Sequence, residues 1–159
     1  MKLIKLLLAA LFFTISSVWA GDLEDGNTAW KAGDYSKALE KYKMASAQGN
    51  ADAPYHVGSM YSEGMGILQD KAEAVKWFRL AASRGNTNSQ NNLASMYYFG
   101  NGAIQDYVKA YMWANIASIK GKYFSALRDL IANSMTPQQI AESQKLAREC
   151  LARNFKSCD

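Results

Sequence analysis

An internal repeat constrains this chain more than any other feature. Residues 51–86 and 87–122 align without a gap at a separation of 36 residues, and eleven positions are identical. The identical pairs are Ser59/Ser95, Met60/Met96, Tyr61/Tyr97, Gly64/Gly100, Gly66/Gly102, Gln69/Gln105, Asp70/Asp106, Ala74/Ala110, Trp77/Trp113, Ala81/Ala117 and Gly85/Gly121. A period in the thirties with helical spacing inside each unit predicts stacked helix pairs, because one pair alone cannot bury its apolar face. Such architectures usually bind other proteins.

The first half of the second unit predicts a helix and a glycine-rich loop. The helix is expected from about Asp52 to Glu63, with Gly58 where a partner helix approaches closely. In the loop that follows, Ile67 and Leu68 are expected to fill the gap between the helices, while the glycines permit positive φ.

The second half of this unit predicts a capped helix with one apolar face. Asp70 is the expected N-cap, and Glu73 would complete a capping box. Arg84 is expected to meet the negative end of the helix before Gly85 terminates it. The inward-facing residues recur at i, i+3, i+4 and i+7, namely Ala74, Trp77, Phe78 and Ala81.

The remaining chain repeats this arrangement in modified form. The third unit keeps the cap Asp106 but has Lys109 in place of the acid, so its cap should be weaker. A degenerate first unit is expected at about 23–49, and a C-terminal helix pair at 123–154. Thr136 begins a further capping box, with proline at the first helical position of the last helix.

The two aligned units resemble Sel1-like repeats, a subclass of the tetratricopeptide superfamily. The second unit carries the pattern at Val57, Gly58, Tyr61, Gly64, Gly66, Asp70, Ala74, Trp77, Ala81, Ala82 and Gly85. The third carries it at Leu93, Tyr97, Gly100, Gly102, Asp106, Ala110, Trp113, Ala117 and Gly121. It departs at Ala94, where the usual glycine is missing, which suggests wider helix spacing there. The resemblance implies an all-α fold for residues 21–159, a right-handed α-solenoid of stacked antiparallel helix pairs.

Residues 1–20 have the pattern of a secretory signal peptide. Lys2 and Lys5 precede an apolar run, and Val18 and Ala20 are small residues at a cleavage site expected after Ala20. The alternative is an uncleaved anchor helix, which the short span disfavours. We therefore expect a periplasmic or secreted protein with no membrane insertion after cleavage.

The charge balance argues against nucleic acid as a partner. Removal of Lys2 and Lys5 lowers Lys plus Arg from 18 to 16 against 14 acids, so the formal charge falls from +4 to +2. The remaining basic residues are scattered and form no dense stripe that would bind phosphates.

The two cysteines predict a structural disulfide. Cys150 and Cys158 lie in the last ten residues, and secretion would deliver them to a compartment where disulfides persist. Closing so short a loop would stabilise the fold by about 2.5 kcal/mol and would pin the terminus. A redox role is the alternative, but the pair is not a C-x-x-C motif.

No residue pattern indicates catalysis, a metal site or a cofactor. His56 is the only histidine, and it lacks a metal-ligand partner at suitable spacing, although Glu63 could share its face. Asp34, Asp70 and Asp106 recur, but each lies where a helix cap is required. Some secreted, cysteine-rich Sel1-like proteins are associated with β-lactam binding or hydrolysis, so action on β-lactams or cell-wall material is the alternative function. Those relatives carry a disulfide in each repeat, which this chain lacks.

The expected binding surface is the concave face formed by the first helix of each unit. An envelope protein or peptide is the expected partner, because aromatic rings supply contact area and amides hold a backbone. Packing between units is the alternative role for Trp30 and Tyr98. The chain is expected to be a monomer or a weak homo-oligomer, since its two small ends could stack. The predicted contact residues are Asn27, Trp30, Lys31, Tyr55, Ser59, Ser62, Asn91, Ser95 and Tyr98.

Overall fold

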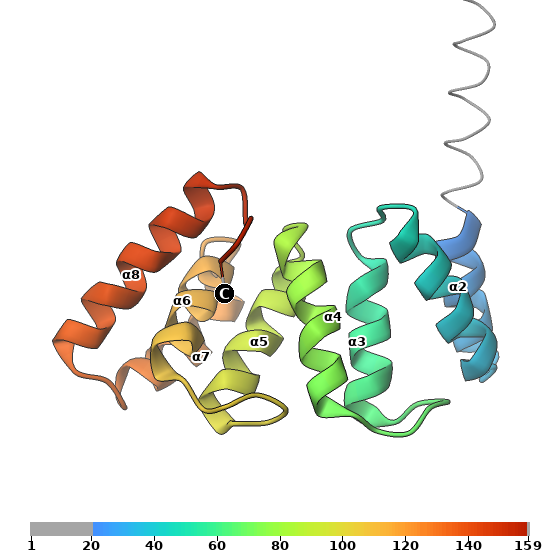
Figure 1. The fold of residues 1–159 in the computed structure, drawn as a ribbon, viewed down its shortest axis with the longest axis horizontal. Coiled ribbons are helices and arrows are strands. Elements are labelled where there is room, and N and C mark those ends of the chain that lie inside the picture. Colours follow the sequence, from blue (N-terminus) through green and yellow to red (C-terminus); the bar gives the residue numbers. More distant parts are fainter. Residues whose placement is uncertain (1–20, 159) are drawn as a thin grey trace, which may run out of the picture.

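The computed structural model describes residues 21–158, and every regular element in this range is helical. Helices follow one another along the longest axis from α2 to α8 (Figure 1). The predicted all-α solenoid is thus confirmed, while the predicted signal peptide lies outside the described residues. The elements are a helical segment at 21–31, α2 (Tyr35–Ala47), α3 (Ala53–Glu63), α4 (Lys71–Ser83), α5 (Thr87–Phe99), α6 (Tyr107–Ser118), the 3₁₀ turn η1 (Lys122–Phe124), α7 (Ser125–Ala132) and α8 (Pro137–Ala152).

The repeated aspartates begin the second helix of each unit, as predicted. The side chains of Asp34, Asp70 and Asp106 accept the backbone N–H of the residue three positions later, at 3.1, 2.9 and 3.0 Å. Each satisfies one of the amides that the first helical turn leaves without a partner. The capping box at Thr136 and Gln139 is also present.

The capping box predicted at Asp70 is only half formed, so that prediction is wrong for Glu73. The Glu73 carboxylate accepts bonds from Lys76 Nζ at 2.7 Å and Trp77 Nε1 at 3.1 Å. It has no N–H to accept at Asp70, because that amide already donates to the carbonyl of Tyr61 at 2.9 Å. The loop between α3 and α4 is closed by this backbone bond.

Gly58 permits the close packing of α3 on α4. A Cβ atom at this position would lie 2.8 Å from two ring carbons of Phe78, well inside ordinary contact distance. At the equivalent positions of the third unit the residues are Ala94 and Ala114, both fully buried. The methyl group of Ala94 has room because Ala114 stands where the second unit has the ring of Phe78. The missing glycine therefore has a reason other than wider helix spacing.

Polar contacts between units also repeat every 36 residues. Lys43 Nζ donates to the Tyr61 hydroxyl at 3.1 Å, and Arg79 Nε donates to the Tyr97 hydroxyl at 3.2 Å. In both cases a cation on the second helix of one unit contacts a tyrosine on the first helix of the next.

Arg84 is the C-cap residue of α4, and its side chain links two units. Its Nη1 donates to the carbonyls of Ser46 at 3.1 Å and Asn50 at 2.8 Å, at and beyond the end of α2. The expected interaction with a negative helix end is therefore made with the preceding unit. The carbonyls at the end of α2 accept this charged donor, which fixes the second unit against the first.

The loops between first and second helices pack against the preceding unit through their glycines. A Cβ at Gly66 would lie 2.4 Å from Cβ of Tyr35, and one at Gly102 would lie 2.3 Å from the carbonyl oxygen of Lys71. Two positions after each glycine the side chain points outward, so Leu68 is 88% exposed and the equivalent Ile104 is 91% exposed. The prediction that Leu68 fills the gap between helices is wrong.

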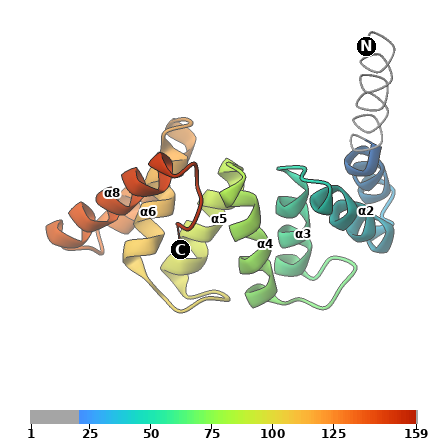
Figure 2. The same ribbon diagram turned by 45° about the horizontal axis from the view of Figure 1, so that its top comes forward.

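The C-terminal helices depart from the stacked hairpin of the earlier units. Both α7 and α8 pack on α6, and they make little contact with each other. Figures 1 and 2 show α8 lying across α6. The predicted disulfide between Cys150 and Cys158 is present, and it holds the tail so that Phe155 packs on the core beside Gly85. The tail thereby folds back toward α4 and α6, where Phe155 lies close to Ser83 and Trp113.

Candidate functional site

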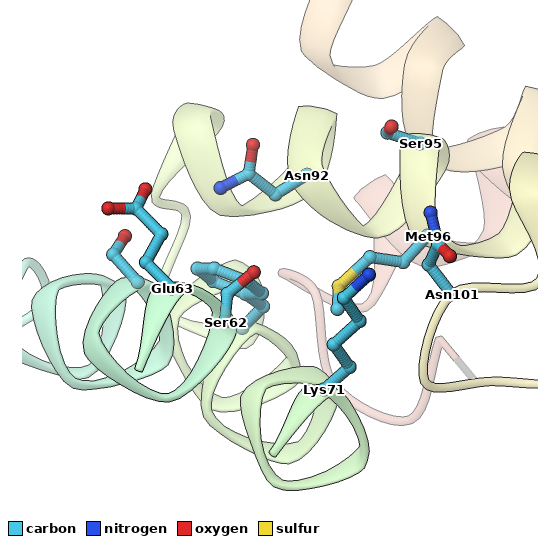
Figure 3. Close-up of a pocket in the computed structure, with 9 residues that line it drawn as sticks. Ser62, Glu63, Lys71, Asn92, Ser95, Met96 and Asn101 are labelled. Carbon is cyan, nitrogen blue, oxygen red and sulfur yellow. The ribbon is translucent and has the colours of Figure 1, made fainter. Parts of the chain in front are cut away.

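A polar cleft of about 240 Å³ opens where α3, α4 and α5 meet (Figure 3). One wall comes from the end of α3 and the other from the middle of α5, while the start of α4 and the loop after α5 close one side. Its lining residues are Ser59, Ser62, Glu63, Lys71, Phe78, Asn92, Ser95, Met96 and Asn101.

Helical spacing places the wall residues on the faces that do not form the core. On α3, Ser59, Ser62 and Glu63 follow one another at i, i+3 and i+4, while the intervening Met60 is fully buried. On α5, Asn92 and Ser95 have the same spacing. Ser59 and Ser95 are equivalent positions of α3 and α5, the first helices of successive units, and the cleft lies between these two helices.

The polar side chains of the cleft have few partners within the protein. Ser59, Ser62, Asn92, Ser95 and Asn101 make no side-chain hydrogen bond to any residue in the range 21–158. Their hydroxyl and amide groups are therefore available to a ligand, as donors and as acceptors.

Two opposite charges lie at the rim of the cleft. Glu63 and Lys71 are exposed, and neither has an ion-pair partner among the residues that the structure describes. The Lys71 side chain extends toward Met96 and Asn101 in Figure 3, and Glu63 lies on the side of Asn92. A bound segment would thus meet a carboxylate and an ammonium at different points.

Three of the nine predicted contact residues, Ser59, Ser62 and Ser95, line this cleft. Tyr55 lies next to it, since its ring centroid is 6.1 Å from that of Phe78 in the cleft lining. Asn91 is half-buried one position before the wall residue Asn92, and it does not line the cleft.

The other predicted contact residues lie elsewhere. The Asn27 side-chain oxygen accepts the hydroxyl of Tyr42 at 2.9 Å, so it holds the first unit together. Trp30 packs edge to face on Tyr35 with ring centroids 5.1 Å apart, and Lys31 beside it is exposed.

Tyr98 belongs to a separate aromatic group that contacts the next unit. Its ring lies 4.8 Å from Phe99 and 5.6 Å from Tyr107, and its hydroxyl is 3.2 Å from Ser134 Oγ. Tyr98 therefore contacts the next unit, and Trp30 packs against a core cluster that includes Val57 and Met60 of the second unit.

Four polar residues of the cleft were not predicted from the sequence, namely Glu63, Lys71, Asn92 and Asn101. Glu63 and Asn92 could have been found, because each is three or four residues from a predicted serine on the same helix. Lys71 and Asn101 carry no such signal, because they come from outside the first helices. They meet only because the loop after α5 packs on the start of α4, at Gly102.

The histidine of the sequence is not part of the cleft. His56 lies outside it, stacked on Tyr42 with ring centroids 4.6 Å apart and an interplanar angle of 14°. Burial lowers the pKa of His56 from its usual range, and the negative charge of Asp52 opposes this in part. Among residues 21–158 no group of three His, Cys, Asp or Glu side chains is placed to hold a metal ion, and no helix there is long and apolar enough to cross a bilayer.

The solved structures that are similar to this chain include the following two. A protective antigen present in uropathogenic Escherichia coli strains, which displays an SLR fold, matches with 25% identity and a TM-score of 0.81 over 88% of this chain. The match covers 31% of that protein, so this chain spans about a third of its length. A Sel1 repeat protein from Oxalobacter formigenes has the same fold, with 23% identity and a TM-score of 0.65 over 77% of this chain and 96% of the other.

The comparison of families gives the same result as the fold. No curated protein matches this chain. The model of the Sel1 repeat matches three consecutive segments, 24–50, 51–86 and 87–122. Repeats of this type generally mediate interactions between proteins. Because the three matches together cover more than half of the sequence, this protein belongs to the Sel1 repeat family.

Proposed function

We propose that the protein is a non-catalytic binding scaffold of the bacterial envelope, periplasmic or secreted, that holds a short extended segment of a partner protein in the α3–α5 cleft. Membership of the Sel1 repeat family supports the general role in protein binding. We choose this cleft as the site because its polar side chains have no hydrogen-bond partners among the described residues.

These side chains suit a peptide backbone. Every residue of an extended segment presents an N–H donor and a C=O acceptor that lose water on binding and must be replaced by protein groups. The amides of Asn92 and Asn101 can donate and accept at once, and the three serines can do either. Phe78 and Met96 add an apolar contact for one small side chain.

The size and charge of the cleft limit what it can hold. A volume of about 240 Å³ is smaller than most pockets for drug-sized ligands, so only a short stretch of the partner enters it. Glu63 and Lys71 would favour a segment whose charges match theirs in order, which gives the interaction a direction along the peptide.

The envelope location is supported by two features of the chain. The predicted signal peptide would export the protein, and the disulfide between Cys150 and Cys158 would persist in an oxidising compartment.

Site-specific photo-crosslinking in intact cells tests this function. A photoreactive amino acid replaces Ser95 in the cleft and, as a matched control, Glu142 on the exposed side of α8. The proposal predicts that one envelope protein is crosslinked from position 95 and not from position 142, and mass spectrometry identifies it. Equal crosslinking from both positions, or capture of cell-wall fragments alone from position 95, would overturn it.

A further inference from the structure

We propose a second binding site on another face of α4, which takes an acidic segment of a partner protein that carries an apolar side chain. The site is a cleft of about 490 Å³ between α4, the loop after α5 and the first turn of α6. It does not depend on the α3–α5 cleft. Its apolar lining is Ala72, Val75, Ala103 and Ile104, and its cations are Lys76, Arg79 and Lys109.

The equivalent positions at the junction of the first and second units have the opposite charge. Residues 36 positions earlier than Lys76 and Lys109 are Glu40 and Glu73. Only the cation that contacts the tyrosine of the next unit is kept, as Lys43 in one junction and Arg79 in the other. The first junction therefore stacks with acids where the second has lysines.

Packing between units thus does not require Lys76 and Lys109 to be basic. The apolar character of the lining is largely the same in both junctions, since Leu39 precedes Val75 and Leu68 precedes Ile104 by 36 residues. What distinguishes the second junction is its positive charge, which points to recognition of a negatively charged partner.

Lys76 and Lys109 line the cleft and can pair with such a partner. Lys109 Nζ lies 5.4 Å from the ring centroid of Tyr97, and no carboxylate among residues 21–158 pairs with it. Lys76 pairs with Glu73 at 2.7 Å, but its side chain is 70% exposed. Asp106 also lines the cleft, where one oxygen accepts the backbone N–H of Lys109 at 3.0 Å. The lining thus has three basic side chains and one acidic side chain.

The apolar part of the cleft indicates that the partner contributes an apolar side chain as well as negative charge. Ile104 is 91% exposed at its edge, and the volume is sufficient for a large side chain. Burial of such a side chain supplies affinity, while carboxylates on either side of it pair with the lysines and set specificity. With two separate sites the scaffold could join two partners.

Selection from a library of random peptides displayed on phage tests this proposal without a known ligand. The folded wild-type protein is the target, and Lys76→Glu/Lys109→Glu is the comparison, because it places the acids of the first junction in the second. Lys122→Glu/Lys145→Glu, with both lysines exposed elsewhere, is the control for net charge. Circular dichroism verifies folding, and Lys76→Gln/Lys109→Gln replaces the first pair if that variant is unfolded.

We expect the wild type to enrich peptides in which Asp or Glu flanks an apolar residue. A synthetic peptide of this type should bind about tenfold more weakly to Lys76→Glu/Lys109→Glu and unchanged to the control variant. The proposal would be overturned if the wild type enriches no acidic peptides, or if the peptide binds Lys76→Glu/Lys109→Glu and the control variant with equal affinity. It would also be overturned if anionic phospholipid vesicles bind through these lysines and the peptides do not. None of these results bears on crosslinking from Ser95.

Discussion

Gly58 should be unfavourable to replace in the wild type and favourable to replace once Phe78 is removed. In Gly58→Ala the new Cβ would lie 2.8 Å from two carbons of the Phe78 ring, which is 2% exposed and has little room to move. Such overpacking costs about 1–3 kcal/mol, and the higher helix propensity of alanine returns about 1 kcal/mol. We expect a net loss in the free energy of unfolding of about 1 kcal/mol.

The sign should reverse in the Phe78→Ala background. Loss of the ring alone should cost about 3–5 kcal/mol, because it leaves a cavity between α3 and α4. There the methyl group introduced at position 58 meets no ring, so Gly58→Ala should stabilise by about 1 kcal/mol through helix propensity. The double variant has the alanine pair that the third unit has at Ala94 and Ala114.

Equilibrium unfolding in urea of the four proteins measures this coupling. The expected interaction free energy is about 2 kcal/mol, with similar m-values in all four so that the cooperativity of the repeat array is unchanged. If Gly58→Ala changes the free energy of unfolding by the same amount in both backgrounds, within about 0.5 kcal/mol, the contact with Phe78 is not the reason for glycine at position 58.

Three further predictions concern the disulfide at the C-terminus and the side chains of Arg84 and His56. Replacing Cys150 and Cys158 by serine should lower the free energy of unfolding by about 2.5 kcal/mol in urea, and a reducing agent should affect only the wild type. Arg84→Met should speed hydrogen exchange at the end of α2 more than at the end of α6, since about 1.5–3 kcal/mol of charged hydrogen bonding to α2 is lost. The pKa of His56 is lowered in the folded state, so the unfolded chain binds the proton first. Stability should therefore fall as the pH drops below about 6.5, and this part of the fall should be absent in His56→Phe, as measured by thermal unfolding between pH 7 and 5.

Features that depend on residues close in sequence could be predicted from the sequence. The caps at Asp70 and Asp106 need only a side-chain oxygen and an amide three residues away, so spacing alone identifies them. The disulfide joins Cys150 and Cys158, which are eight residues apart, and the sequence has no other cysteine with which either could pair. The repeat period predicted the stacking for a similar reason, because each unit contacts mainly its neighbours.

Features that depend on contacts between units could not be predicted in this way. Leu68 is turned outward because the glycine loop packs by its backbone on the unit before it, a contact that no pattern within the loop reveals. A contact between two helices of one unit has the same effect on Glu73, which takes Lys76 and Trp77 as partners because the amide of Asp70 already donates to the carbonyl of Tyr61.

The candidate site shows the same division. Helical spacing brought Ser59, Ser62 and Ser95 to one cleft, since Ser59 and Ser62 share one face of α3 and Ser95 is the equivalent of Ser59 on α5. Lys71 and Asn101 join them only through the packing of the loop after α5 on α4. Their part in the site therefore required the three-dimensional arrangement.

The affinity of the crosslinked partner segment for cleft variants tests the central claim most directly. Asn92→Ala/Asn101→Ala removes two amides from the cleft, and Asn88→Ala/Gln138→Ala removes two exposed amides outside it. Calorimetric titration should show a loss of about tenfold or more for the first variant, because two hydrogen bonds of about 0.5–1.5 kcal/mol each are lost, and no change for the second. Equal affinity of the wild type and Asn92→Ala/Asn101→Ala, with both proteins folded, would contradict binding in the α3–α5 cleft.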